Sequence, residues 1–210
     1  MTINKMTQFV ITLVLLDCLV IPFILGAFYP KYSHMKMVLS VLGAKKSPVR
    51  LFYNFWMACL GIGFIIIGFK LFASYKSTWY IPSMLLLMVT ISYAILDCLV
   101  SSIFSVGDSK EMLTLAEKLH GYGSAIGCTL FVLGGLFATM LLWKNHPLAA
   151  RWLLICWLMA ILTFGAFVSG DNVTQSVSGI KKLLIYNGLW QRISFLLMYI
   201  PYIVLSLLKE

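Results

Sequence analysis

The chain has 210 residues, of which 61% are hydrophobic and only 11% are charged, and its formal net charge is +9. Charged residues make up about a quarter of an average globular protein, so this composition excludes an ordinary water-soluble domain and predicts an integral membrane protein. No polar stretch is long enough to fold separately, which predicts a single membrane domain over residues 1–210. The basic excess is spread over loops, without an aromatic-interleaved basic patch. It therefore favours membrane lipids over nucleic acid as partners.

Six apolar runs are long enough to span a bilayer. A helix needs roughly 20 apolar residues to cross about 30 Å of hydrocarbon, and lipid offers no partner to backbone polar groups, so such runs must be helical. The predicted spans cover residues 9–28, 51–72, 80–104, 120–143, 149–168 and 184–207, with a kink expected at Pro201. We predict an all-α, multi-pass protein of the cell membrane whose six helices form three helical hairpins.

The connections between these spans alternate in length. Those after the second and fourth spans are short, whereas those after the first, third and fifth spans cover residues 29–50, 105–119 and 169–182. One end of the bundle is therefore thin and carries both termini, and the other end is elaborated. A count of every Lys and Arg favours the elaborated end as the cytoplasmic one, whereas the density of basic residues in the short connections favours the thin end. Because positive charge in short loops stays on the cytoplasmic side, we favour cytoplasmic termini.

The tetrapeptide Asp-Cys-Leu-Val occurs twice inside predicted spans, at Asp17–Val20 and Asp97–Val100. A charged carboxylate in hydrocarbon costs at least about 2.5 kcal/mol, so such residues face a bundle interior and commonly carry function. The repeat also suggests an internal duplication, although matches this short arise by chance in apolar sequence. The five cysteines of the chain all lie in apolar runs without CxxC spacing, and we expect them to be packing residues.

The third span carries the best polar stripe. Its members are spaced by three, four or seven residues, which places them on one helical face: Thr90, Tyr93, Asp97, Ser101 and Asp108. The stripe could line a polar cavity or a path for protons. It could equally hold helices together through hydrogen bonds worth about 0.6 kcal/mol each. We favour the second interpretation for the hydroxyls and a functional role, or an obligatory ion pair, for Asp97.

Asp17 lies near the middle of the first span and is expected either to be protonated or to pair with a cation. The candidate cation is Arg192 in the sixth span, beside Gln191, because a guanidinium matches a carboxylate in shape. Alternatively, Arg192 extends to the lipid headgroups.

The elaborated end contributes further polar residues. Tyr32, Ser33 and His34 follow the first span, and His120 opens the fourth span. Ser124 and Cys128 follow His120 on the same helical face, where Gly123 and Gly127 form a small-xxx-small pair that permits close helix contact. No HxxxH or HExxH spacing connects the histidines, so we expect no metal and no cofactor.

Four motifs in order resemble the bacterial and archaeal membrane family known as domain of unknown function 998. They are the Tyr-Pro-x-Tyr-Ser-His loop (Tyr29 to His34) with Ser40, Leu42, Gly43 and Pro48 after it, an acidic loop after the third span, His120, and Gly188 to Arg192 at the start of the last span. Members of that family often have Phe-Pro before the acidic residue, whereas this chain has Phe104-Ser105-Val106-Gly107-Asp108. The resemblance implies a six-span fold and a set of site residues, and it implies no activity.

We expect a polar site between helices that opens towards the elaborated end and binds or handles a lipid or another amphipathic small molecule. Alternatives are an intramembrane acid–base enzyme acting on a lipid-like substrate, with Asp97 and His120 as candidate catalytic residues, and a small proton-coupled transporter, which could act as a homo-oligomer. Candidate ligand-binding residues are Asp17, Tyr32, Ser33, His34, Asp97, Asp108, His120, Gln191 and Arg192. The Tyr29–His34 loop is expected to cover the site.

Overall fold

The computed structural model describes residues 4–107, 112–170 and 179–208. These residues form helices and loops without a strand, and six helical segments are long and apolar enough to cross a membrane. The segments are Lys5–Ala27, Arg50–Tyr75, Tyr80–Ile103, Leu115–Leu142, Pro147–Gly170 and Asn187–Leu208. The predicted all-α, six-span architecture is confirmed, while the grouping into three hairpins stays a prediction.

Two of the spans contain a π-helical turn. The first span consists of α1 (Lys5–Leu15), the π-turn η1 (Leu16–Val20) and α2 (Ile21–Ala27). The third consists of α4 (Tyr80–Ser92), the π-turn η3 (Tyr93–Leu99) and α5 (Val100–Ile103). The turns contain the aspartates of the two Asp-Cys-Leu-Val segments. The sequence repeat is therefore also a repeat of an unusual backbone geometry. π-turns are rare and often occur at functional sites, which directs attention to both segments.

The remaining spans are more regular. They are α3 (Arg50–Tyr75), α6 (Leu115–Val132) with α7 (Gly134–Leu142), α8 (Pro147–Gly170) and α9 (Asn187–Leu208), and short 3-10 turns lie at η2 (Leu39–Gly43) and η4 (Gly179–Ile185). α6 begins five residues before the predicted start, because Thr114 and Glu117 form a reciprocal capping box. α9 continues through Pro201 to Leu208.

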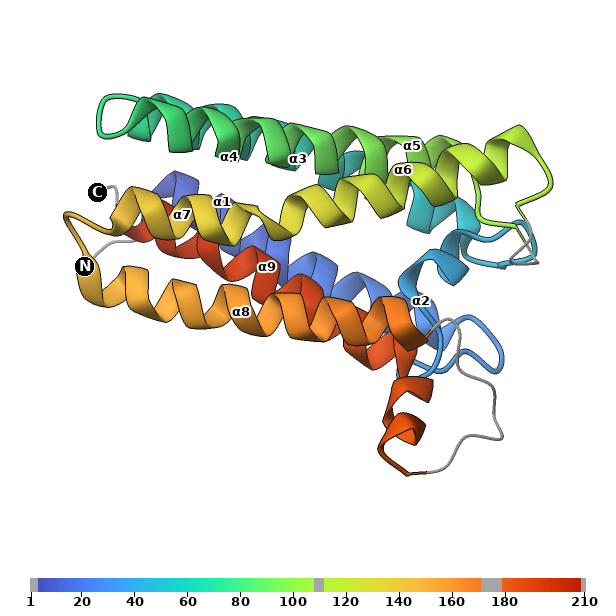
Figure 1. Ribbon diagram of the computed structural model, residues 1–210. Coiled ribbons are helices and arrows are strands. Elements are labelled where there is room, and N and C mark those ends of the chain that lie inside the picture. Colours follow the sequence, from blue (N-terminus) through green and yellow to red (C-terminus); the bar gives the residue numbers. More distant parts are fainter. Residues whose placement is uncertain (1–3, 108–111, 171–178, 209–210) are drawn as a thin grey trace.

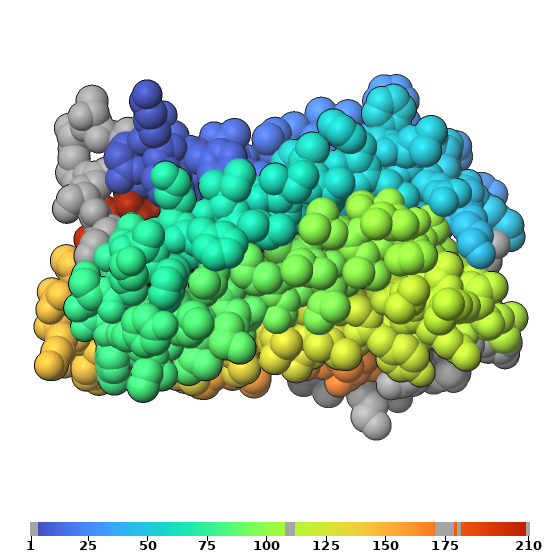
Figure 2. Space-filling view, turned by 90° about the horizontal axis from the view of Figure 1, so that it is seen from above, coloured from blue at the N-terminus to red at the C-terminus, as the bar shows by residue number. Residues whose placement is uncertain are grey.

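Neighbouring helices pack around the bundle. α3 lies beside α4, η3 against α6, α7 beside α8, α8 beside α9, and α1 against α9. Figure 1 shows both termini and the short connections at one end, and the longer connections at the other. Figure 2 shows the spans of α3, α4 and α6 side by side on one face. The expected thin and elaborated ends are therefore observed.

A cluster of buried aromatic rings fills the centre of the bundle. The rings of Tyr93 and Phe131 stack at 4.0 Å, and Phe131 stacks on Tyr202 at 5.2 Å. The Tyr93 hydroxyl lies 2.7 Å from that of Tyr199, so these buried hydroxyls have partners. The cluster makes the middle of the bundle a packed core and leaves room for a cavity only towards the ends.

The π-turn η3 is packed closely by glycines of α6. A Cβ atom at Gly123 would meet the Leu96 carbonyl oxygen at 2.7 Å, and one at Gly127 would meet the Asp97 nitrogen at 3.0 Å. The predicted small-xxx-small pair is thus a real close approach of two helices. It fixes the backbone around Asp97 against α6.

Candidate functional site

A cavity of about 700 Å³ lies at the elaborated end of the bundle. Its polar wall comes from the two π-turns, through Asp17 and Asp97, and from α6, through His120 and Ser124. Its apolar wall comes from several elements and includes Leu39, Met57, Leu60, Met112, Phe164, Phe167 and Phe195. The lining therefore combines carboxylate, imidazole and hydroxyl groups with hydrocarbon and aromatic surface.

The polar residues lie at graded depths below the elaborated end. At 1.5 Å per residue, His120 is about 8 Å from the start of α6 and Asp97 is about 9 Å from the end of α5. Asp17 is about 15 Å from the end of α2 by the same measure. These groups occupy one half of the membrane thickness. The central aromatic cluster closes the bundle beyond them.

The cavity opens sideways between α6 and α8. Ala125 and Thr129 of α6 and Val168 of α8 line it and are also exposed on the outside of the bundle. α6 and α8 diverge towards the elaborated end, whereas α7 stays packed on α8 (Figure 1). Because the outside of these spans is the lipid-facing surface, a molecule in the bilayer can reach the polar wall without crossing the loops.

Asp17 is held by donors on two other spans. Its Oδ1 accepts a hydrogen bond from Trp56 Nε1 at 2.9 Å, and its Oδ2 accepts one from the Tyr199 hydroxyl at 2.8 Å. Since Tyr199 donates to Asp17, the Tyr93 hydroxyl must donate to Tyr199. Both carboxylate oxygens are therefore engaged. Asp17 acts as a polar tie between the first, second and sixth spans.

Asp97 has a different environment, although both aspartates are more than nine-tenths buried. Its carboxylate faces the Ser124 hydroxyl and the Cys128 thiol of α6. Ser124 is in turn 3.2 Å from the Ser101 hydroxyl. These are weak, neutral partners on the cavity wall, so Asp97 retains capacity for a ligand that Asp17 does not have.

His120 presents one ring nitrogen to the cavity. Its Nδ1 lies 2.9 Å from the Phe104 carbonyl oxygen, which can only accept, so Nδ1 carries the proton. In the neutral ring, Nε2 is then an acceptor, and in the part of the chain that the structure describes it has no hydrogen-bond partner. His120 is 7% exposed and lines the cavity. The imidazole is thus a fixed, unpartnered acceptor.

Arg192 ties down the loop that joins α2 and α3 over residues 28–49, which we call the covering loop because its residues 38–41 line the cavity. Its Nη1 donates to the carbonyl oxygens of His34, Met37 and Gly188 at 2.7–3.2 Å. Its Nη2 donates to the Tyr32 hydroxyl at 2.8 Å and lies 3.4 Å from His34 Nδ1. The neighbouring Gln191 Oε1 accepts from the Leu39 backbone nitrogen. The last span therefore satisfies carbonyls and an amide of a non-helical segment that could not stay unpaired near lipid.

The guanidinium also affects the titration of the loop. Partial burial and the charge of Arg192 both lower the pKa of His34 below its ordinary value of 6.5. Burial raises the pKa of Tyr32, against the opposing effect of Arg192. His34 is therefore neutral near pH 7, and its Nδ1 can accept from Arg192.

A family comparison is consistent with this arrangement of spans and motifs. The chain matches the family model described as "Protein of unknown function (DUF998)" over residues 12–208. The chain belongs to the DUF998 family. No curated protein and no solved structure matches it. Membership in DUF998 confirms the predicted resemblance.

The candidate residues of this DUF998 protein fall into two groups. Asp17, Asp97, His120 and Gln191 line the cavity, whereas Tyr32, His34 and Arg192 form the tie of the covering loop. Ser33 belongs to that loop, where its hydroxyl caps the Lys36 nitrogen. Asp108 lies outside the described residues.

Arg192 does not take the role expected for it. Among the described residues it makes no ion pair with Asp17 or Asp97, and it is not part of the cavity wall. The reason is the covering loop, whose carbonyls lie 155 and 158 residues away in the chain and attract the guanidinium first. The alternative, in which Arg192 extends to the lipid headgroups, is not observed either, because its guanidinium donates to protein groups.

Some residues of the site were not expected from the sequence. Trp56, Tyr199, Phe164 and Met112 contact Asp17 or line the cavity. Tyr199 carried a usable signal, because a tyrosine in the middle of a span must find a partner for its hydroxyl. The others have no distinguishing sequence pattern within apolar runs.

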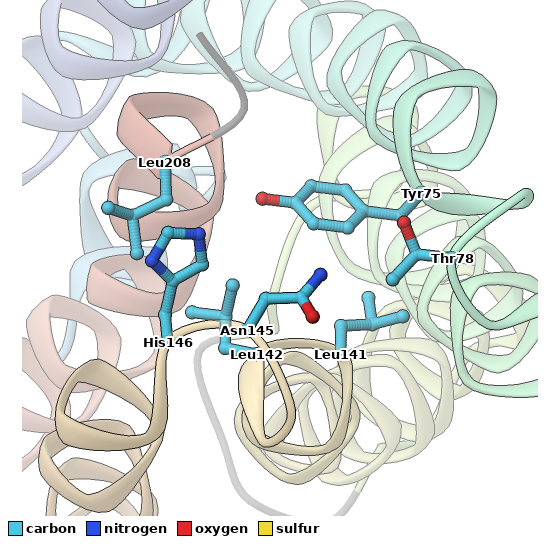
Figure 3. Close-up of a pocket in the computed structure, with 7 residues that line it drawn as sticks. All are labelled: Tyr75, Thr78, Leu141, Leu142, Asn145, His146 and Leu208. Carbon is cyan, nitrogen blue, oxygen red and sulfur yellow. The ribbon is translucent and has the colours of Figure 1, made fainter.

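A smaller pocket of about 220 Å³ lies at the thin end, between the short connections and the end of α9. Figure 3 shows His146 and Asn145 projecting into it beside Tyr75 and Leu208. Its described lining contains no carboxylate and no residue of the four motifs, so the large cavity is the better candidate site in this DUF998 chain.

Proposed function

We propose that this DUF998 protein binds an amphipathic molecule of the membrane, with its polar part in the large cavity and its apolar part leaving between α6 and α8. The observation that carries the proposal is the sideways opening of a cavity that is lined by both polar and apolar side chains. A volume of about 700 Å³ is within the range of about 300–1,000 Å³ that small-molecule sites occupy.

The site is also suited to a ligand that arrives within the bilayer. The opening, which we call the threshold of the cavity, is lined by the exposed small side chains of Ala125, Thr129 and Val168, and the polar groups lie behind them. The covering loop, tied by Arg192 and Gln191, closes the cavity towards the aqueous side. A lipid-like ligand is therefore favoured over a water-soluble one.

The test is retention of a ligand through purification. We expect native mass spectrometry of the protein, released from mild detergent, to show a bound amphiphile. Ala125→Trp should lose it, because an indole at the threshold fills the opening. Ala73→Trp is the matched control, since Ala73 is an exposed alanine of α3 near the thin end. A bare wild-type chain, or equal retention in both variants, would contradict the proposal.

A second candidate function is an acid–base enzyme acting on the same kind of molecule. The observation that favours it is His120, whose Nδ1 is fixed by the Phe104 carbonyl so that a free Nε2 base faces the cavity near Asp97. A proton that Nε2 takes from one atom of the bound molecule would be returned to another by the same imidazolium.

The enzyme hypothesis predicts a chemical change in membrane lipids. Total membrane lipid extract incubated with wild-type protein should change in composition by mass spectrometry, whereas His120→Gln should leave it unchanged while keeping the wild-type melting temperature. Identical extracts after both incubations would refute this second candidate and leave the binding proposal standing.

A further inference from the structure

The chemistry of the cavity wall indicates which headgroup it prefers, provided that the proposed function is correct. Among the residues that the structure describes, the wall includes three carboxyl groups, of Asp17, Asp97 and Glu117, and no lysine or arginine lines it. Two of these carboxyl groups are already engaged. Asp17 accepts from Trp56 and Tyr199, and Glu117 pairs with Lys45 at 3.1 Å and with its own helix cap.

Two acceptors of the cavity wall lack a strong donor. Asp97 faces only a hydroxyl and a thiol, and His120 Nε2 has no partner among residues 4–107, 112–170 and 179–208. His120 is 7% exposed and lines the cavity, so the accessible part of its ring faces the cavity. A ligand that displaces water from these acceptors must supply donors of its own, because an acceptor left unpaired costs about 1–3 kcal/mol.

An anionic headgroup does not fit this wall. A phosphate or carboxylate here would lie beside Asp97 without a counter-charge, and burying an unpaired charge is strongly unfavourable. Arg192, which the sequence suggested as a counter-charge, already donates to two carbonyls and a phenol of the covering loop and to the Gly188 carbonyl of its own helix. Lys45 is held at the rim by Glu117.

We infer that the ligand is an amphiphile with a protonated primary amine, which donates to the Asp97 carboxylate and to His120 Nε2. A primary ammonium supplies three N–H donors, which suffice for the Asp97 carboxylate and His120 Nε2, and a positive charge that balances the carboxylate. Its hydrocarbon chain leaves through the opening between α6 and α8.

The experiment uses four probes with the same twelve-carbon chain: dodecylamine, dodecanol, dodecanoate and dodecyl phosphate. Each is titrated into the full-length protein in a non-ionic detergent at pH 7, with binding followed by calorimetry. We expect dodecylamine to bind at least tenfold more tightly than dodecanol, and the two anions to bind most weakly. Asp97→Asn should reduce amine binding to the level of dodecanol.

Two variants make the outcomes distinguishable. Ser83→Ala serves as a control, because the Ser83 hydroxyl bonds only carbonyls of its own helix and lies outside the cavity. Ala125→Trp should abolish binding of every probe. If dodecanol or an anion binds as well as the amine and Ala125→Trp abolishes it, the headgroup inference is wrong and the proposed function stands. If no probe binds, both are wrong. Equal amine binding by Asp97→Asn and wild type also overturns the inference.

Discussion

Replacing each repeated aspartate by asparagine should separate stability from binding. Asp17→Asn removes the charge from two hydrogen bonds, those donated by Trp56 and Tyr199. Hydrogen bonds to charged groups exceed neutral ones by about 1 kcal/mol, so the variant should lose about 2 kcal/mol of unfolding free energy. The loss is limited because Tyr199 can turn its hydroxyl to Tyr93, 2.7 Å away.

Asp97→Asn should behave differently. Its carboxylate faces the cavity, Ser124 and Cys128, with which an amide can still exchange hydrogen bonds. We expect no loss of stability, because a neutral amide costs less to bury than a carboxylate with only neutral partners. The same chemical change in the same tetrapeptide therefore gives two different results.

The assay is equilibrium unfolding in mixed micelles of dodecyl maltoside and SDS, followed by near-UV circular dichroism. A double-mutant cycle between Asp17→Asn and Trp56→Phe should give a coupling energy of about 1 kcal/mol, and a cycle between Asp97→Asn and Trp56→Phe should give none. A loss for Asp97→Asn as large as that for Asp17→Asn would refute the assigned roles.

Further predictions concern the loop, the helix packing and the orientation. Arg192→Lys should speed backbone hydrogen exchange over residues 29–43, because an ammonium cannot reach all the acceptors of the guanidinium. The protection factors of the same loop, which correct exchange rates for their intrinsic pH dependence, should also fall as pH falls below about 6.5, since protonating His34 opposes Arg192. Those of His34→Gln should not respond to pH. Gly127→Ala should lower the melting temperature, because its Cβ would lie 3.0 Å from the Asp97 nitrogen, while Gly165→Ala, with nothing within 4 Å, should leave it unchanged or raise it. A fluorescent protein fused to the C-terminus should fold and fluoresce if the termini are cytoplasmic.

Each of these has an outcome that contradicts it. If hydrogen exchange of the loop is as slow in Arg192→Lys as in wild type, the hydrogen bonds of the guanidinium are not needed to hold the covering loop in place. Because the folded pKa of His34 is lowered, its contribution to stability is full above the unfolded pKa and is lost as pH falls towards the folded pKa. A loss of loop protection when the pH is raised would contradict this prediction. Equal tolerance of alanine at Gly127 and Gly165 would argue against the close approach of α6. A dark C-terminal fusion alongside a periplasmic reporter that is active would invert the orientation.

The spans could be predicted from hydrophobicity because lipid imposes helices of fixed minimum length. Their ends were less predictable: Leu115 starts α6 because Thr114 and Glu117 cap it, a short motif that lies outside the apolar run. The two π-turns had no signature in the hydrophobic periodicity, and even the polar stripe of the third span was spaced as in a regular α-helix. Only the placement of two aspartates marked them.

The candidate site was partly predictable for a similar reason. A carboxylate or histidine in an apolar run is conspicuous, so Asp17, Asp97 and His120 could be identified from their positions alone. Their partners could not, because Trp56 and Tyr199 reach Asp17 across 39 and 182 residues of sequence. Arg192 could be identified in the same way, but its partners could not. Carboxylates of the first and third spans were expected, whereas the guanidinium binds carbonyls of a non-helical loop.

The central claim is that the cavity between α6 and α8 holds an amphipathic ligand whose polar end meets Asp97 and His120. An experimental structure of the protein in a lipidic mesophase tests it most directly. The account predicts elongated non-protein density through the opening beside Ala125, ending within about 3.5 Å of the Asp97 carboxylate and His120 Nε2. A cavity containing only ordered water, or density whose polar end lies outside the bundle, would contradict it.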